Sequence, residues 1–237
     1  MKLSIIIPVF NERKTIAQII KRVKDARVTG FEKEVIIVDD GSTDGTQSDI
    51  KKSIKGSSIE FIQHEKNQGK GAAVKTGILK ATGDYIIIQD ADLEYNPNDI
   101  EKLTVPIKKR LTKVVYGTRL HRLPNLQRDE RTAQFLIHYF GNRFLSLLTS
   151  ILYGQWITDM ETCYKLFPRE ALKGIKLNSR GFDFEPEITT KLMKKGYKIM
   201  EIPINTNPRG YDEGKKLNTI RDGTIALYTL IKYRFVD

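Results

Sequence analysis

The amino-acid sequence predicts an α/β fold, in which a mostly parallel sheet carries helices on both faces. Short apolar runs rich in β-branched residues recur through the first 120 residues, and amphipathic stretches lie between them. The runs at 5–7, 35–38 and 86–88 are continuously apolar, which is typical of strands that are buried on both faces. No linker, internal repeat or low-complexity tract divides the chain, so we expect a single domain over residues 1–237.

The first half of the chain, residues 1–120, is expected to supply five strands at 3–8, 34–39, 59–64, 84–89 and 113–116. The stretch 15–28 has apolar residues at helical spacing and is expected to form a helix that covers the sheet. In an open sheet of this kind, ligands collect at the carboxyl ends of the strands. The residues that follow each apolar run are therefore the first candidates for a functional site.

The second half, residues 121–237, is expected to be more helical and more basic. A basic loop at 119–131 leads into an apolar helix at 133–153, and a helix at 185–195 precedes a strand at 197–203. A basic amphipathic helix at 219–235 follows. The apolar face of the 133–153 helix suits either a membrane surface, with basic side chains at the headgroups, or a contact within the core or an oligomer.

The charge of the chain indicates an anionic partner. Forty Lys and Arg residues against 29 Asp and Glu residues leave a formal net charge of +11. This excess suits a nucleic acid, a membrane surface or a phosphorylated small molecule. The single cysteine, Cys163, excludes an internal disulfide and fits a reducing compartment. Pro8 and Asn11 interrupt the N-terminal apolar run, so we expect a first strand and not a signal peptide, in a cytoplasmic protein without a membrane span.

Carboxylates follow three of the predicted strands at the point where each strand ends. Glu12 comes shortly after the first run, Asp39 and Asp40 end the second, and Asp90, Asp92 and Glu94 end the fourth. Alone, the run Asp-Asp-Gly-Ser at 39–42 equally suits a turn with a helix N-cap. Three acidic strand ends at one edge of a basic protein favour a site for a cation or a substrate.

Asp90, Asp92 and Glu94 alternate along the chain, and side chains at i and i+2 of an extended segment point the same way. Paired carboxylates suit Mg²⁺ or Mn²⁺ held together with substrate phosphates, where the ion stabilises a departing diphosphate. The chain has neither a P-loop nor a Gly-x-Gly-x-x-Gly after the first strand. The glycines within 67–73 are better explained by a turn and a closely packed helix start.

Four motifs, in this order and spacing, resemble those of the family 2 glycosyltransferases, which bind nucleotide sugars with a GT-A fold: residues 4–12, 38–45, 67–72 and 90–92. Further motifs resemble the polyprenyl-phosphate branch of that family, typified by dolichyl-phosphate mannose synthase: residues 117–119, 159–167, 202–204 and 209–215. The resemblance covers essentially the whole chain. It implies a Rossmann-like GT-A fold with a nucleotide-sugar-binding half at 1–120 and an acceptor-binding half at 121–237.

The resemblance also implies roles for individual residues. The nucleoside would be bordered by Pro8, Phe10, Glu12, Asp39 and Asp90. Asp92 and Glu94 would ligate Mg²⁺ or Mn²⁺, and Arg119 and Arg131 would hold the acceptor phosphate. Arg209 and Lys215 would close over the diphosphate and the acceptor phosphate. The implied catalytic set is Asp90, Asp92, Arg119, Arg209 and Lys215. Arg and Lys suit these positions, because a guanidinium binds phosphate bidentately and an ammonium adds a point charge.

The activity implied is a metal-dependent, inverting transfer of a hexose from a nucleotide-diphospho-sugar to a polyprenyl or dolichyl phosphate. The enzyme would lie peripherally on the cytoplasmic face of the membrane. The donor could be of the GDP-mannose or the UDP-glucose type, because mannose synthases commonly carry Gln at position 94 and a Thr-Gly-Ser-Phe-Arg-like run at 161–165. An acceptor phosphate is already an anion, so His64, His121 and His138 have no required role.

Two alternatives remain. The acceptor could be a soluble sugar or protein, for which Asp159 or Glu161 would act as the general base, although Asp159 equally suits a buried salt bridge. The chain could instead bind nucleic acid, which only its charge supports. Basic residues interleaved with aromatic ones are missing from the sequence, and acidic strand ends would repel a phosphodiester backbone.

Overall fold

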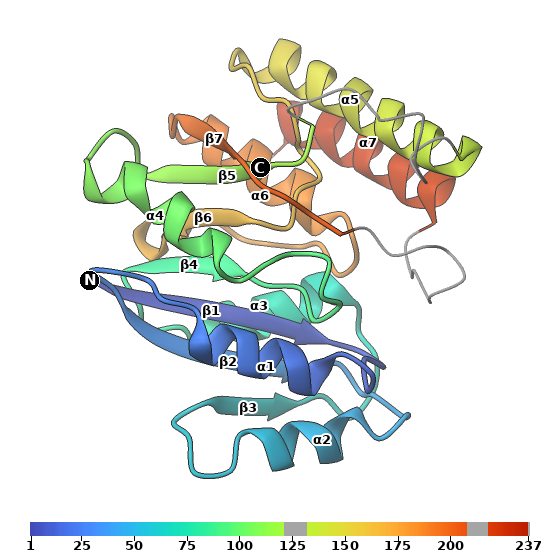
Figure 1. Ribbon diagram of the computed structural model, residues 1–237. Coiled ribbons are helices and arrows are strands. Elements are labelled where there is room, and N and C mark those ends of the chain that lie inside the picture. Colours follow the sequence, from blue (N-terminus) through green and yellow to red (C-terminus); the bar gives the residue numbers. More distant parts are fainter. Residues whose placement is uncertain (121–131, 208–217, 237) are drawn as a thin grey trace.

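A seven-stranded sheet runs through the computed structural model, which describes residues 1–120, 132–207 and 218–236 (Figure 1). The strands are β1 (Lys2–Val9), β2 (Glu32–Asp39), β3 (Glu60–Gln63), β4 (Tyr85–Ile88), β5 (Val114–Thr118), β6 (Lys165–Pro168) and β7 (Ile199–Pro203). Their order across the sheet is β3-β2-β1-β4-β6-β5-β7. The predicted α/β fold with a mostly parallel sheet is confirmed.

The continuous apolar runs form the centre of the sheet. Strand β1 pairs in parallel with β2 on one side and with β4 on the other, so that Ile5 lies opposite Val35 and Ile87. Ile5, Ile6 and Ile7 are fully buried, as expected for a strand that is covered on both faces. The carboxyl ends of β1, β2 and β4 therefore meet at one edge of the sheet.

Strand β6 was not predicted from the sequence, and it runs against its neighbours. It pairs antiparallel with both β4 and β5, while β7 pairs in parallel with β5. Ile87 lies opposite Leu166 and Tyr85 lies opposite Pro168, so β6 begins beside the end of β4. This reversal brings the segment that precedes β6 to the edge where the parallel strands end.

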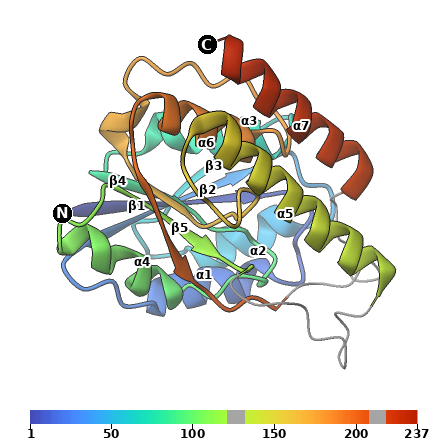
Figure 2. The same ribbon diagram turned by 90° about the horizontal axis from the view of Figure 1, so that it is seen from above.

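Helices cover both faces of the sheet. Figures 1 and 2 show α1 (Ile16–Asp25), α2 (Thr46–Ser53) and α4 (Asp99–Lys108) on one face and α3 (Lys70–Lys80) and α6 (Phe184–Lys194) on the other. A short 3-10 helix, η2 (Arg169–Leu172), follows β6. The buried face of α1 consists of Ile16, Ile19, Ile20 and Val23, at the spacing that predicted this helix.

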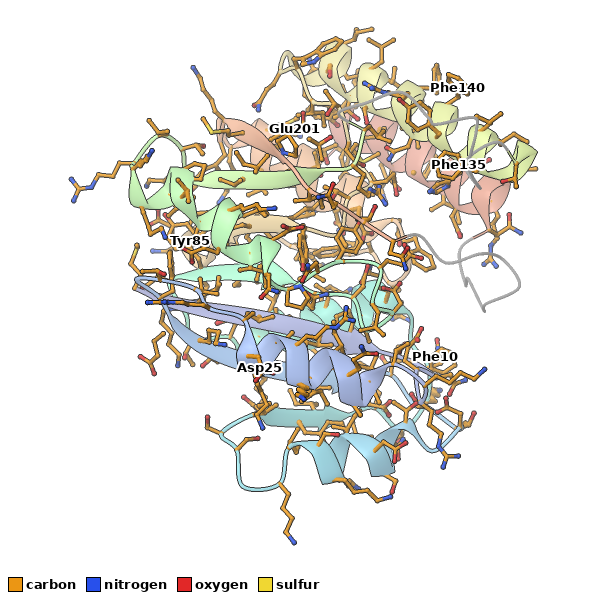
Figure 3. All side chains as sticks on the ribbon, in the orientation of Figure 1. Phe10, Asp25, Tyr85, Phe135, Phe140 and Glu201 are labelled. Atoms are coloured by element: carbon orange, nitrogen blue, oxygen red, sulfur yellow. The ribbon has the colours of Figure 1, made fainter. Side chains whose placement is uncertain are left out.

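Helices α5 (Ala133–Tyr153) and α7 (Thr219–Phe235) pack side by side beyond α6, with the bounds expected from the sequence (Figures 1 and 2). The Tyr153 hydroxyl donates to the Leu230 carbonyl at 2.8 Å, and Leu230 itself is fully buried. Large apolar side chains of both helices are nevertheless exposed: Ile137, Phe140, Phe144, Leu147 and Ile151 on α5, and Ile220, Tyr228, Ile231 and Phe235 on α7. Figure 3 shows Phe140 on the side of α5 that points away from the sheet. Within the described residues, no helix is long and apolar enough to cross a membrane.

The start of α3 packs tightly against the segment that leads into α6. Gly69 has a φ of +98°, and a Cβ at this position would lie 2.3 Å from the carbonyl oxygen of Arg180. A Cβ on Gly71 would lie 2.9 Å from the carbonyl oxygen of Gly181. The glycines of this loop therefore serve a turn and close packing, as expected from the sequence.

Candidate active site

A cavity of about 170 Å³ opens at the carboxyl edge of the sheet, where β1, β2 and β4 end. Figure 3 shows Phe10 at this edge, immediately after β1. The side chains and backbone that line the cavity come from both halves of the chain: Pro8, Val9, Phe10, Glu12, Asp40, Lys70, Ala73, Asp90, Ala91, Asp92, Glu94, Tyr95, Arg119, His138, Glu161, Cys163, Phe182 and Glu185. The expectation that strand ends converge on one site is met.

Seven of the residues to which the resemblance assigned roles lie together in this wall: Pro8, Phe10, Glu12, Asp90, Asp92, Glu94 and Arg119. Asp39 does not line the cavity. It is fully buried, and its Oδ2 accepts hydrogen bonds from the Ser42 backbone N–H at 3.2 Å and from Gln47 Nε2 at 2.9 Å. Arg131, Arg209 and Lys215 lie outside the described residues, so the roles expected of them stay predictions.

Asp40, the neighbour of Asp39, lines the cavity and organises the glycine-rich loop. Its carboxylate accepts hydrogen bonds from the backbone N–H groups of Gln68 and Gly69, the latter at 2.7 Å. The same carboxylate bonds His64 Nδ1 at 2.7 Å, and His64 Nε2 contacts Thr76 Oγ1 at 2.9 Å. His64 therefore has a structural role, which agrees with the absence of any required catalytic role for it.

The Arg119 guanidinium is fixed by a buried carboxylate. Arg119 Nε and Nη2 donate to Asp159 at 2.8 Å each, and the Arg119 backbone N–H donates to the same group at 2.9 Å. Asn142 Nδ2 supplies a fourth hydrogen bond at 2.8 Å. Burial alone would raise the pKa of Asp159, but the charge and hydrogen bonds of Arg119 outweigh it and hold the pKa below its ordinary value. Asp159 is thus a salt-bridge partner, the simpler of the two interpretations that its sequence position allowed.

A second buried cation lies between two carboxylates. Lys70 Nζ is 2.9 Å from Asp90 Oδ1 and 2.9 Å from Glu185 Oε1. Burial would lower the pKa of Lys70, but the charges of Asp90 and Glu185 raise it well above its ordinary value, so the side chain is an ammonium ion. Neither Lys70 nor Glu185 was assigned a role from the sequence. Lys70 lies within the motif at 67–72, whose glycines were explained by packing, and Glu185 lies in the first turn of α6.

Asp92 and Glu94 lie on a short loop that is bonded to the segment after β7. The Asp92 carboxylate accepts a hydrogen bond from the Glu94 backbone N–H at 3.0 Å, while the Glu94 carbonyl accepts one from Asn207 at 2.9 Å. Tyr95 also forms a β-bridge with Thr206. The loop is therefore held in place by the segment that follows β7.

The donor set fits Mg²⁺ or Mn²⁺ as a site that a ligand completes. Across residues 1–120, 132–207 and 218–236, no group of three or more His, Cys, Asp or Glu side chains is arranged to hold a metal ion. Asp92 and Glu94 nevertheless present two hard carboxylates in one cavity wall. Mg²⁺ is commonly bound by one or two carboxylates together with substrate phosphates. The third carboxylate, Asp90, is engaged by Lys70.

Two carboxyl groups in the cavity retain unused hydrogen-bonding capacity. Glu161 Oε1 and Glu185 Oε2 are buried atoms without a hydrogen-bond partner in the part of the chain that the structure describes. Burial, together with the negative charge of Glu185, raises the pKa of Glu161 above its ordinary value. The sequence named Glu161 only as a possible base, and it did not indicate Glu185.

Comparison with known proteins places the chain in a family. Residues 4–176 match Glycosyl transferase family 2, and the chain belongs to this family. It is therefore a glycosyltransferase that uses a nucleotide-sugar donor. Uncharacterized protein MJ1222 of Methanocaldococcus jannaschii is 31% identical over 96% of this chain and 90% of its own length.

Two relatives have names that indicate an activity. Glycosyltransferase AglJ of Haloferax volcanii is 28% identical over 96% of this chain and 70% of its own length. A dolichol-phosphate mannosyltransferase of Pyrococcus furiosus is 28% identical over 98% of this chain and 64% of its own length.

The fold is shared with solved glycosyltransferase structures. Glucosyl-3-phosphoglycerate synthase of Mycobacterium tuberculosis, solved with Mn²⁺, UDP and glucosyl-3-phosphoglycerate, superposes with a TM-score of 0.71 at 19% identity. The match covers 100% of this chain and 81% of that one. The same enzyme has been solved with Mg²⁺ and UDP. The GT-A-like fold expected from the sequence is confirmed.

Proposed function

We propose that this glycosyltransferase transfers a hexose, with inversion, from a nucleotide-diphospho-sugar to a polyprenyl phosphate at a membrane surface. The donor is of the GDP-mannose or UDP-glucose type. The name of the Pyrococcus furiosus relative supports the lipid acceptor, and the UDP complexes of the structural neighbour support the donor class. The sequence motifs at 159–167 and 202–204 support the same branch.

The observation that carries the proposal is the position of α5 beside the cavity. His138, in the second turn of this helix, lines the cavity, whereas Phe140, two residues later and on the opposite side of the helix, is 60% exposed, and Phe144 is 57% exposed. The same helix thus borders the polar cavity on one side and carries an apolar outer face on another. This arrangement suits an acceptor with a charged phosphate at one end and a hydrocarbon chain at the other, because each part meets the surroundings that it prefers.

In the proposed reaction, an oxygen of the acceptor phosphate attacks the anomeric carbon and forms the new bond from the face opposite the diphosphate. The bond between the anomeric carbon and the diphosphate breaks, and the diphosphate leaves with its electron pair. The acceptor needs no deprotonation, so catalysis consists of positioning and of stabilising charge. Arg119 suits this task, because Asp159 fixes its orientation and leaves its Nη1 group outside the pair.

Asp92 and Glu94 would hold Mg²⁺ or Mn²⁺ together with the donor phosphates, and the ion would supply Lewis-acid stabilisation of the leaving diphosphate. Pro8, Phe10, Glu12 and Asp90 would border the nucleoside, with Asp39 near its base or ribose. Lys70 lies beside Asp90 and adds positive charge to the same part of the cavity. Arg131, Arg209 and Lys215 keep the phosphate-binding roles proposed from the sequence.

Helices α5 and α7 would attach the protein peripherally to the cytoplasmic face of a membrane. Their exposed apolar side chains lie on neighbouring helices, and α7 adds Arg221, Lys232 and Arg234 as exposed cations. Apolar side chains beside basic ones are the composition of helices that lie in the plane of an anionic bilayer surface. The formal net charge of +11 favours the same surface.

The test is a screen of radiolabelled UDP-glucose and GDP-mannose with a polyprenyl phosphate in detergent micelles, with Mg²⁺ or Mn²⁺ present. After partition between water and organic solvent, we expect label from one donor to enter the organic phase. Label that stays in the aqueous phase with every donor would exclude the lipid acceptor.

Glu161 favours a second candidate, transfer to the hydroxyl group of a soluble acceptor. Such a reaction needs a general base, and a carboxyl with a raised pKa in the cavity wall meets that requirement near neutral pH. Asp159, the other base considered, already accepts four hydrogen bonds. Aqueous product formed from a soluble sugar acceptor, in the absence of lipid, would favour this reaction.

A further inference from the structure

Tyr95 lines the cavity, and the proposed reaction assigns it no role. It directly follows Glu94 in the chain, and its side chain is buried, with an exposed fraction of only 2%. Its backbone is fixed by the β-bridge to Thr206. A buried ring on a fixed backbone holds its neighbours in place, because side chains in a close-packed interior have few alternative positions.

The ring of Tyr95 lies against the Arg119 guanidinium. The Arg119 Cζ atom is over this ring, 5.9 Å from its centroid. Burial raises the pKa of Tyr95 well above its ordinary value, against the opposing charge of Arg119, so the ring is a neutral phenol. A guanidinium at this separation is attracted to the face of an aromatic ring, and the attraction strengthens where water is excluded. Arg119 is therefore held by the Asp159 carboxylate and, through a different contact, by this ring.

Tyr95 is held in turn by the segment that runs into β6. Its hydroxyl accepts a hydrogen bond from the Cys163 backbone N–H at 3.0 Å, and its ring centroid lies 4.8 Å from that of Tyr164. The Tyr164 hydroxyl donates to Gln89 Oε1 at 2.6 Å, and Gln89 Nε2 donates to the Asp90 carbonyl at 3.0 Å. The two tyrosines thus brace the loop that follows β4 at both of its ends.

We propose that Tyr95 is a positioning residue, whose ring orients Arg119 toward the acceptor phosphate while its backbone anchors the loop of Asp92 and Glu94. This inference rests on the phosphate-binding role proposed for Arg119. The acceptor phosphate attacks from the face opposite the diphosphate, so the groups that hold the two phosphates must keep a fixed separation. Tyr95 is bonded to Glu94 and contacts Arg119, and it therefore links the two groups directly.

Substitutions separate the ring of Tyr95 from its hydroxyl group. Tyr95→Phe keeps the ring and removes the acceptor of the Cys163 N–H, whereas Tyr95→Leu and the more flexible Tyr95→Met remove both. Tyr85→Leu is the matched control, because Tyr85 begins β4 at the opposite end and packs edge-on against Phe31. Each Tyr95 change is also made in the Arg119→Lys protein, which gives a double-mutant cycle.

The measurement is a calorimetric titration of each variant in the presence of Mn²⁺. UDP and GDP are the first probes, and their binding reports an intact fold and an intact donor side. Farnesyl phosphate, a phosphate on a short prenyl chain, is then titrated into protein saturated with the diphosphate. Its binding reports the side of the cavity that Arg119 occupies, and urea unfolding gives the stability of each variant.

We expect Tyr95→Leu and Tyr95→Met to bind farnesyl phosphate about tenfold more weakly than wild type, because a desolvated contact between a guanidinium and a ring is lost. Their affinity for the diphosphate should stay within about twofold, since the β-bridge that fixes the loop does not depend on the ring. Tyr95→Phe should keep both affinities and lose only stability, because a buried N–H loses its acceptor. In the Arg119→Lys protein, losing the ring should weaken farnesyl phosphate binding by less than about threefold.

Several results would overturn the inference and leave the proposed function standing. Equal loss of farnesyl phosphate affinity in Tyr95→Phe and Tyr95→Leu would assign the effect to the hydroxyl group. A weakening as large in the Arg119→Lys protein as in wild type would show that Tyr95 does not act through Arg119. Equal weakening by Tyr85→Leu would show a general effect of destabilisation. Failure of wild type to bind a diphosphate or farnesyl phosphate would overturn the proposed function, and this inference with it.

Discussion

Arg119 and Asp159 meet through two parallel hydrogen bonds, from Nε to Oδ2 and from Nη2 to Oδ1, each 2.8 Å long. Asp159 is fully buried, and Asn142 braces it from α5. The pair thus ties the end of β5 to α5 and to the segment before β6. An arginine held in this way presents its remaining N–H groups in a fixed direction, which is the requirement for recognising a phosphate.

Replacing Arg119 with Lys should lower sugar transfer at least tenfold, because an ammonium keeps the charge but cannot form the bidentate pair. The free energy of unfolding should fall by about 1–3 kcal/mol, as expected for a lost hydrogen bond between charged groups. Turnover and urea unfolding would be measured for this variant and for Arg27→Lys, an exposed control on the α1 side. Equal activity of the two variants would contradict a phosphate-binding role for Arg119.

Chelation of divalent ions should abolish transfer, and Mg²⁺ or Mn²⁺ should restore it. The change Asp92→Ala should remove this rescue, because only one carboxylate of the proposed pair remains. The measurement is turnover against metal concentration, with Asp84→Ala at the opposite end of β4 as a control. Full turnover of the Asp92 variant would refute the proposed metal site.

The double change Phe140→Glu and Phe144→Glu should weaken binding to anionic lipid vesicles, because two charges enter the exposed apolar face of α5. Transfer to a polyprenyl phosphate in those vesicles should fall, whereas binding of the nucleotide should not change. Leu79→Glu is the matched control, since Leu79 is 85% exposed on α3. Vesicle flotation reports the binding, and equal flotation of both variants would place the membrane contact elsewhere.

Replacing Gly69 with Ala should destabilise the protein by about 2 kcal/mol or more. The new Cβ would meet the Arg180 carbonyl at 2.3 Å, and φ at this position is +98°. Gly56 also has a positive φ, of +73°, but a Cβ there meets nothing within 4 Å. Gly56→Ala should therefore show only the backbone cost of about 1 kcal/mol. Urea unfolding compares them, and similar losses would argue against close packing at Gly69.

Glu187 should contribute stability that depends on pH. Burial would raise the pKa of Glu187, but hydrogen bonds from Lys191, Ser179 and Asn178 lower its pKa to about 2, below the ordinary 4.5. A group with a depressed pKa in the folded state stabilises the protein above pH 4.5 and loses this effect as the pH falls toward 2.

At pH 7 the variant Glu187→Gln should be less stable than wild type by up to about 3 kcal/mol. The difference should narrow between about pH 4.5 and pH 2, as wild type becomes protonated. Unfolding at a series of pH values gives both quantities, with the exposed Glu170→Gln as the control. A difference independent of pH would mean that packing, and not charge, is what Glu187 contributes.

The sequence predicted the parallel part of the sheet and the two long helices well, because periodicity records burial. The expected strand at 34–39 is the carboxyl part of β2, and the bounds of α5 and α7 agree with the expected ranges. Strand β6 was not predicted, because it has only four residues and gains its conformation from pairing with β4 and β5. Such pairing depends on tertiary neighbours, which a local pattern does not reveal.

The same distinction, between local sequence patterns and tertiary contacts, holds for the candidate site. Asp90, Asp92 and Glu94 could be predicted, because parallel strand ends share an edge. Lys70 and Glu185 lie far apart in the sequence and meet only because α3 and α6 both begin at the cavity. Their ion pair results from the tertiary fold, and the spacing of the two residues in the sequence does not predict it.

The reversed direction of β6 has a practical consequence for engineering. The segment 154–164 starts at the end of α5 and finishes at the start of β6, so both of its anchors belong to the framework. It carries Asp159 and Glu161, whereas the side of the cavity proposed to bind the nucleotide comes from the ends of β1, β2 and β4. This segment can therefore be exchanged as a unit between relatives. We expect such a chimera to change its contacts with the sugar and the acceptor, and to keep the nucleotide preference of the protein that receives the segment.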